Sequence, residues 1–232
     1  MKNEDVDKVL ESKARAAPEL DAALAANIAS SITTSLTPQR PLPPASALIA
    51  ALLLSSATVA VLGAARAGFY GVVRLGLWAP MVILVTCALL TLAVAASLVS
   101  EFIPGSRRYL SPGVLDAAVV LVLLAVFGAL FRDLRTDHFF SAGLTCLTTG
   151  VLHALPAGLI AWLLVRRGYA VNPISAGLLM GLLGGLAGLT MLELHCTNFQ
   201  ASHVLVWHTA VVPASGAIGG AIAWALSRGA AR

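Results

Sequence analysis

Long apolar runs dominate the chain from residue 45 onward. A transmembrane helix needs about 20 predominantly apolar residues to cross a hydrocarbon core of about 30 Å. Six stretches meet this requirement: residues 45–65, 75–99, 113–131, 142–165, 174–194 and 204–227. Short segments that contain Arg, Pro, Asp or Asn separate these stretches. The pattern therefore predicts an all-α fold, built as a six-helix transmembrane bundle.

A different pattern precedes the bundle. Between residues 3 and 36, apolar side chains recur at helical spacing in one narrow stripe, formed by Val6, Val9, Leu10, Leu20, Leu24, Ile28, Ile32 and Leu36. Pro18 separates the two halves of the stripe and suits the first turn of a helix. Prolines at 38, 41, 43 and 44 forbid a continuous helix into the bilayer. We therefore expect two domains: a helical tail with a Pro-rich spacer at residues 1–44, and a membrane domain at residues 45–232.

The composition agrees with a membrane protein and indicates its orientation. Hydrophobic residues make up 58% of the 232-residue chain and charged residues 11%, against about 25% in soluble proteins. The Arg residues between the apolar stretches indicate topology rather than a nucleic-acid surface. With a cytosolic N-terminus, the inner segments carry eleven Lys and Arg residues and the outer segments four. This bias favours both termini in the cytosol. We expect no signal peptide, because over forty residues precede the first apolar run.

The apolar stripe of the tail must be buried against lipid, against the rest of the chain or against a partner. Lipid is disfavoured, because residues 1–44 carry six acidic and five basic side chains and no Trp or Phe. A helix packed on the protein's own loops and a helix that captures a protein partner both stay open. For a partner, we expect Leu20, Leu24, Ile28 and Ile32 to form the contact surface.

The three cysteines lack the spacing of a disulfide-rich scaffold or of a CxxC redox motif. Cys87 falls near the middle of the second span, where we expect a small apolar core residue. Ser141 predicts a helix start that sets Cys146 about one and a half turns into the fourth span. Cys196 directly follows the fifth span. A disulfide requires Cα atoms within about 7 Å, so these two thiols can meet only if their helices are neighbours.

Most histidines fall on the predicted outer side, together with Cys146 and Cys196: they are His138, His195, His203 and His208. His153 lies near the bilayer centre, where we expect a neutral imidazole packed in the bundle. Thiolates and neutral imidazoles bind zinc and other soft or borderline divalent metals. We therefore take His195, Cys196 and Cys146 as candidate ligands of a transient thiophilic divalent ion, and we expect no other cofactor.

The spacing of these residues matches no standard zinc motif. An α-helix would set His203 and His208 about 140° apart around its axis, which separates them as ligands unless the loop adapts. The alternative to a metal site is a set of loop histidines that hydrogen-bond to the backbone.

Several features of the chain occur together in one family. A helix leads into the segment SLTPQRPLPP at residues 35–44, six spans follow, one cysteine lies near the start of the fourth span and another follows a histidine after the fifth. With the stretch from His195 to His208, these features resemble the negative regulator of sigma-F family of bacterial membrane anti-sigma factors. The resemblance implies a protein that holds an extracytoplasmic-function sigma factor at the inner membrane and releases it under external stress. It implies that Cys146 and Cys196 are the sensing pair, with no enzymatic activity and no direct contact with nucleic acid.

Two other classes of protein stay open. Six spans with glycine-rich helices suggest a transporter, but the spans lack the charged pairs typical of ion-coupled transport. Gly181, Gly184, Gly185 and Gly188 are better explained by close helix packing. A membrane thiol oxidoreductase is expected to keep a closely spaced cysteine pair, whereas the shortest spacing here is fifty residues.

Overall fold

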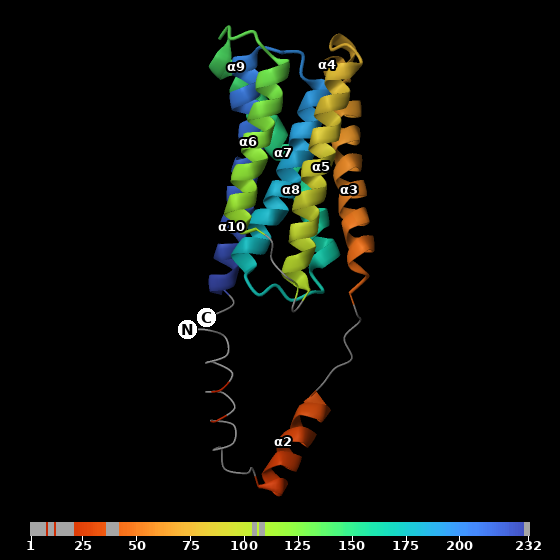
Figure 1. Cartoon of the computed structure of the whole chain (residues 1–232), viewed down its shortest axis with the longest axis vertical. Coiled ribbons are helices and arrows are strands. Elements are labelled where there is room, and N and C mark those ends of the chain that lie inside the picture. Colours follow the sequence, from red (N-terminus) through yellow and green to blue (C-terminus); the bar gives the residue numbers. More distant parts are fainter. Residues whose placement is uncertain are drawn as a thin grey trace. The chain divides into compact units, whose positions relative to one another are not determined.

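The chain divides into two compact units, residues 1–41 and residues 42–232. A computed structural model describes residues 8, 12, 21–35, 42–103, 106 and 110–229. Long helices make up most of this described part, and no strand occurs within it (Figure 1). The predicted all-α fold class is confirmed.

Among the described residues of the first unit, residues 21–35 form the longest stretch, and it contains the helix α2 (Ala22–Ser35). Asp21 caps its N-terminus, because the Asp21 carboxylate accepts a hydrogen bond from the backbone N–H of Ala23 at 3.0 Å. Leu24 and Ile28 follow each other along one face of α2 and are 52% and 45% exposed. The other expected stripe residues Val6, Val9, Leu10, Leu20 and Leu36, and the expected helix start at Pro18, lie outside the described residues.

The second unit contains the membrane bundle. Six of its described helical segments are long and apolar enough to cross a membrane, which confirms the six predicted spans. Five of them are α3 (Ala45–Ala67), α5 (Trp78–Phe102), α6 (Pro112–Leu130), α7 (Phe139–Val165) and α8 (Pro173–His195). The sixth joins α9 (Ala201–His203), the π-helical turn η1 (Val204–His208) and α10 (Thr209–Gly229). A short helix, α4 (Tyr70–Arg74), lies between α3 and α5.

Helix α8 is the centre of this bundle. It contacts α3, α5, α7 and α10, and its apolar side chains are buried on most of its circumference. Two of its glycines allow neighbouring backbones to approach closely. A Cβ at Gly188 would lie 2.2 Å from the carbonyl oxygen of Gly150 in α7, and one at Gly181 would lie 2.1 Å from that of Ser215 in α10. The glycines of α8 therefore serve helix packing.

This packing leads to a stability prediction. Gly188→Ala should destabilise the bundle by roughly 1–3 kcal/mol, because the added methyl group meets backbone that cannot move without separating α7 from α8. Thermal unfolding of the purified protein in detergent measures the effect. Gly128→Ala in α6 is the matched control, since a Cβ there meets nothing within 4 Å. Equal melting temperatures for the two variants would contradict the packing role.

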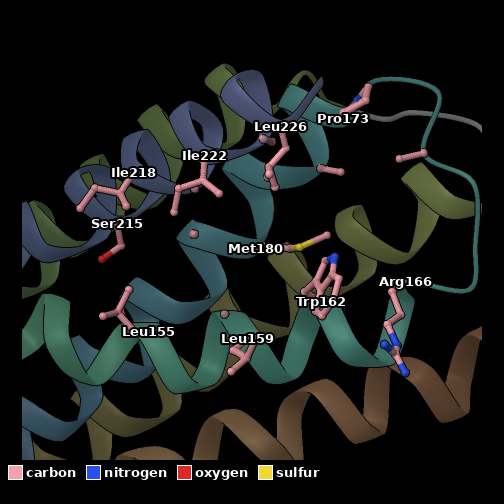
Figure 2. Close-up of a pocket in the computed structure, with 18 of the residues that line it drawn as sticks. Leu155, Leu159, Trp162, Arg166, Pro173, Met180, Ser215, Ile218, Ile222 and Leu226 are labelled. Carbon is pink, nitrogen blue, oxygen red and sulfur yellow. The ribbon is translucent and has the colours of Figure 1, made fainter. Parts of the chain in front are cut away.

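The two ends of the bundle differ in their chemistry. The start of α3 and the end of α10 lie at one end, and α4 and α9 lie at the other (Figure 1). Near the first end, a cavity of about 940 Å³ opens between α7, α8 and α10 (Figure 2). Apolar side chains such as Leu159, Met180 and Ile222 line most of this cavity. The residues that carry thiol and imidazole chemistry gather near the second end instead.

Candidate functional site

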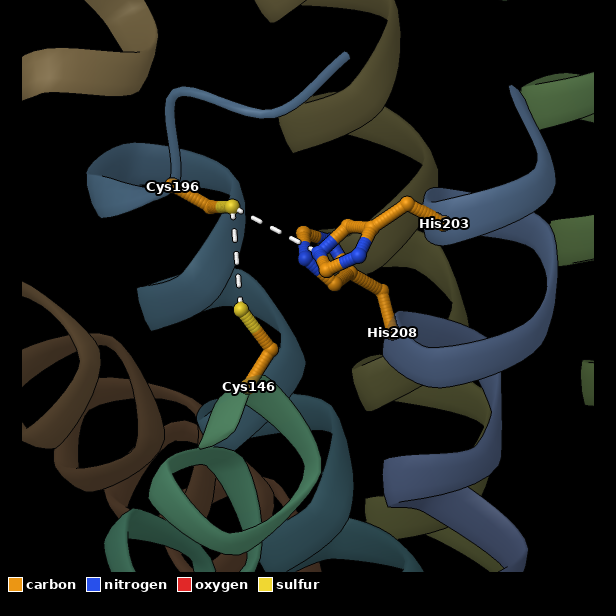
Figure 3. Close-up of side chains that lie close together, drawn as sticks. All are labelled: Cys146, Cys196, His203 and His208. Carbon is orange, nitrogen blue, oxygen red and sulfur yellow. Dashed lines mark hydrogen bonds between the residues drawn. The ribbon is translucent and has the colours of Figure 1, made fainter. Parts of the chain in front are cut away.

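Four side chains that offer sulfur or nitrogen ligands meet next to α9: Cys146, Cys196, His203 and His208 (Figure 3). One ligand atom from each residue lies within 4.8 Å of those from the other three. The four residues come from α7, from the turn after α8, and from α9 and η1 of the sixth span. We refer to these four residues as the Cys/His cluster.

The two cysteines in the cluster are free thiols that lie in contact. Their sulfur atoms are 3.7 Å apart, and the Sγ atom of Cys196 is also 3.7 Å from Nε2 of His203. The backbone N–H of Asn198 points at the same sulfur from 3.5 Å. The structure thus brings together Cys146 and Cys196, which the family resemblance marked as the sensing pair.

The π-helical turn explains why the two histidines of the cluster face each other. The expectation from an α-helix, that His203 and His208 point apart, is wrong: their rings are 5.0 Å apart in a T-shaped arrangement. In η1 the backbone N–H of Thr209 donates to Val204 O, five residues earlier. Within this wider turn, two residues that are five positions apart lie on the same face of the helix. Such π-helical turns occur often at functional sites.

A buried carboxylate holds one of these histidines. The Nδ1 atom of His208 lies 2.6 Å from the carboxylate of Glu193, and both side chains are almost fully buried. The amino-acid sequence suggested that the spans lack such pairs, and the contact between Glu193 and His208 corrects that expectation. A carboxylate inside a membrane bundle needs a hydrogen-bonding or charged partner, and His208 supplies one.

Two ring nitrogens in the cluster have no hydrogen-bond partner among the described residues. They are Nδ1 of His203 and Nε2 of His208. Each histidine is only 1% exposed, so water at the surface does not reach these rings. Buried polar atoms in folded proteins are nearly always paired, which makes these two nitrogens unusual.

The cluster also changes the acidity of Cys196, which lies between the membrane-spanning segments. The neighbouring Cys146 thiol and the His203 ring hydrogen-bond to its sulfur and hold the pKa of Cys196 well below its ordinary value. Burial acts in the opposite direction but does not cancel this effect. The thiolate is the form of cysteine that binds metals and attacks electrophiles. Cys196 is therefore the most reactive thiol that the arrangement supports.

Other residues considered from the sequence lie elsewhere. His195, expected as a metal ligand, donates from Nδ1 to the carbonyl oxygen of Gly68 at 3.0 Å and packs against Tyr70. His153 hydrogen-bonds to the carbonyl oxygen of Thr149 inside the bundle. Cys87 is 2% exposed in the apolar core. The Cys/His cluster thus contains His203 and His208, and His195 is not part of it.

The turn that carries Cys196 is tied to the loop between α6 and α7. The backbone N–H of Ala201 donates to Asp133 O at 2.6 Å, and the Ser202 hydroxyl donates to Arg135 O. Phe199 stacks on Phe131 with ring centres 6.0 Å apart. These contacts fix the approach of Cys196 to the other members of the cluster.

A known family of proteins shares the sequence features of this chain. Residues 32–228 match the family model described as negative regulator of sigma F. The chain belongs to this family. The match includes all six spans and the whole Cys/His cluster, but it begins after Leu24 and Ile28 of the tail. No curated protein and no solved structure was found to match the chain. The family is a regulatory one, and its description names a sigma factor as the target of negative regulation.

Proposed function

We propose that this protein is a membrane-bound anti-sigma factor of the bacterial inner membrane. Its cytosolic tail holds an extracytoplasmic-function sigma factor, and a metal or redox signal at Cys146 and Cys196 releases it. The match of residues 32–228 to the negative regulator family is the observation that carries this proposal. The tail and the Cys/His cluster supply the two activities that such a regulator needs, which are capture of a partner and detection of a signal.

The exposed stripe of α2 supports capture of a protein. Leu24 and Ile28 form an apolar surface on a helix that belongs to the first compact unit, separate from the unit that contains the membrane bundle. An amphipathic helix of this kind binds by placing its apolar face in a hydrophobic groove of the partner. The tail has neither the basic excess nor the aromatic residues of a lipid-binding helix.

The distribution of charge supports a cytosolic tail. The start of α3 and the end of α10 share one end of the bundle, and the segments at that end and in the tail carry eleven of the fifteen Lys and Arg residues. Positive residues favour the cytosolic side. In this orientation the Cys/His cluster faces the outside, where stress signals arrive.

The two alternative functions are affected differently by the structure. The sulfur separation of 3.7 Å removes the spacing argument against a thiol oxidoreductase. Family membership favours regulation over redox catalysis. For a transporter, the cavity between α7, α8 and α10 is lined mostly by apolar side chains, and neither Glu193 nor His208 lines it. A regulator therefore explains more of the molecule.

Cross-linking in intact cells tests the proposed function. A photo-reactive amino acid at Ile28 of the full-length protein should yield a covalent adduct with a sigma factor, identified by mass spectrometry after purification. The same group at Ala26 lies about 200° away around the helix and should give little adduct. Since sigma factors reside in the cytosol, an adduct also verifies the orientation of the tail. Adducts without any sigma factor would refute the proposal.

A further inference from the structure

We propose that Cys146, Cys196, His203 and His208 form a four-ligand site for one divalent cation of the zinc class, with Glu193 positioning His208. This inference rests on the proposed function, because it identifies what the sensing site binds. The two sulfurs and one nitrogen of each imidazole would surround the ion tetrahedrally. Neither the spacing of these residues nor the family description assigns such a site.

Two of the distances between ligand atoms already match tetrahedral coordination. Zinc binds thiolate sulfur at about 2.3 Å and imidazole nitrogen at about 2.0–2.1 Å, which sets adjacent sulfurs about 3.8 Å apart and sulfur and nitrogen about 3.6 Å apart. The observed separations are 3.7 Å between the two sulfurs and 3.7 Å between Sγ of Cys196 and Nε2 of His203. Only small side-chain movements are needed to bring all four ligand atoms onto one ion.

The hydrogen bonds around His208 have the form found behind metal-bound histidines. Its Nδ1 atom donates to the Glu193 carboxylate, while its Nε2 atom is buried and has no hydrogen-bond partner among the described residues. A carboxylate that holds the far nitrogen fixes the tautomer and turns the other nitrogen's lone pair toward the metal. An ion would satisfy the buried nitrogen that the protein itself leaves unpaired.

The ligand types select the class of ion. Two thiolates and two imidazoles in a tetrahedron suit zinc and its heavier relative cadmium, whereas magnesium and calcium require oxygen ligands. A divalent ion with two thiolates carries no net charge, which suits a site with little access to water. Each thiol that is still protonated loses its proton to solvent when the ion binds. Cys146 is only partly buried, so the ion can enter from its side.

Cobalt titration of the full-length protein tests this site. Reduced protein in detergent should bind one Co²⁺ per chain, with the strong visible bands of tetrahedral cobalt and a thiolate-to-cobalt charge-transfer band, and Zn²⁺ should displace it. His203→Gln and His208→Gln should each weaken binding at least tenfold. Glu193→Gln keeps all four ligands and should weaken binding about 10–100-fold, the range typical of such supporting residues.

The controls separate ligation from folding and from the proposed function. His153→Gln and His195→Gln should keep wild-type affinity, and thermal unfolding in detergent should show that every variant is folded. Wild-type affinity in His203→Gln and His208→Gln, or the pale spectrum of octahedral cobalt, would overturn the site. So would a cysteine pair that forms a disulfide on oxidation but binds no cobalt when reduced. The titration contains no sigma factor, so it tests the metal site independently of the proposed function. If the protein captures a sigma factor in the cross-linking experiment but binds no cobalt in the titration, the metal site alone is refuted.

Discussion

Replacing Leu24 and Ile28 with Asp should release the sigma factor and switch on its genes without any stress. Both side chains are exposed on α2 and lie one helical turn apart, as a partner-binding stripe requires. Burying a Leu or Ile side chain stabilises a complex by about 1.5–3 kcal/mol. Loss of both contacts removes at least about 3 kcal/mol, which is more than a hundredfold in affinity. A reporter driven by a promoter that the sigma factor recognises measures the effect.

The matched control places the same charges on the opposite face of the helix. Ala26→Asp with Ser30→Asp adds two carboxylates about 200° around from the stripe and should leave repression intact. Both double variants need normal protein levels in the membrane fraction. Full repression in the Leu24→Asp, Ile28→Asp variant would show that the stripe does not hold the sigma factor.

The membrane bundle was predictable because hydrophobic length alone specifies a span. Each of the six apolar runs corresponds to one helical segment long enough to span the membrane. Asn172 illustrates local control of a helix start, since its side chain caps α8 just before Pro173. The position of each helix within the bundle was not predictable in this way, because hydrophobicity does not specify which helix is central. The central place of α8 follows from its glycines, whose close contacts depend on which neighbours face them.

Only the two cysteines of the Cys/His cluster were predictable from the sequence, because the spacing of the two histidines suggests that they point in different directions. A regular α-helix separates His203 from His208, and nothing in the hydrophobic pattern reveals that η1 widens the turn between them. His195 and Cys196 are neighbours in the sequence, yet the end of α8 turns His195 toward Gly68 while Cys196 turns into the cluster. One residue in the sequence could have pointed to His208. Glu193 falls within an apolar span, and a buried acid in a membrane helix calls for a partner such as His208.

The site and the tail are connected by packed helices. Cys146 lies on α7 and Cys196 follows α8, and both of these helices contact α3. Helix α3 begins at Ala45, directly after the spacer that carries the tail. An ion that binds only one arrangement of α7 and α8 shifts the equilibrium toward that arrangement. Because α3 is the first helix after the spacer, we expect such a change to reach the tail through α3.

The free energy needed to release the sigma factor favours a metal over a disulfide as the signal at this site. Moving the protein from 1% to 99% released requires about 5.5 kcal/mol of preference for the releasing state. A disulfide typically contributes about 2–4 kcal/mol. Zinc binding to structural sites is worth about 10–16 kcal/mol, so a fraction of that energy is enough. The comparison explains why the cluster would use two histidines in addition to the cysteine pair.

Cys146→Ser and Cys196→Ser should each abolish induction while leaving repression in unstressed cells intact. The two sulfurs lie 3.7 Å apart and we expect them to act as one unit, so the double variant should be no worse than either single variant. Cys87→Ser is the matched control and should keep induction, because Cys87 lies in the apolar core and is not one of the four cluster residues. Reporter activity with and without added Zn²⁺ or Cd²⁺, at equal protein levels, measures the response. Induction that survives in the double variant would assign the two thiols to helix packing, because no sensing unit that requires their sulfur atoms could then operate.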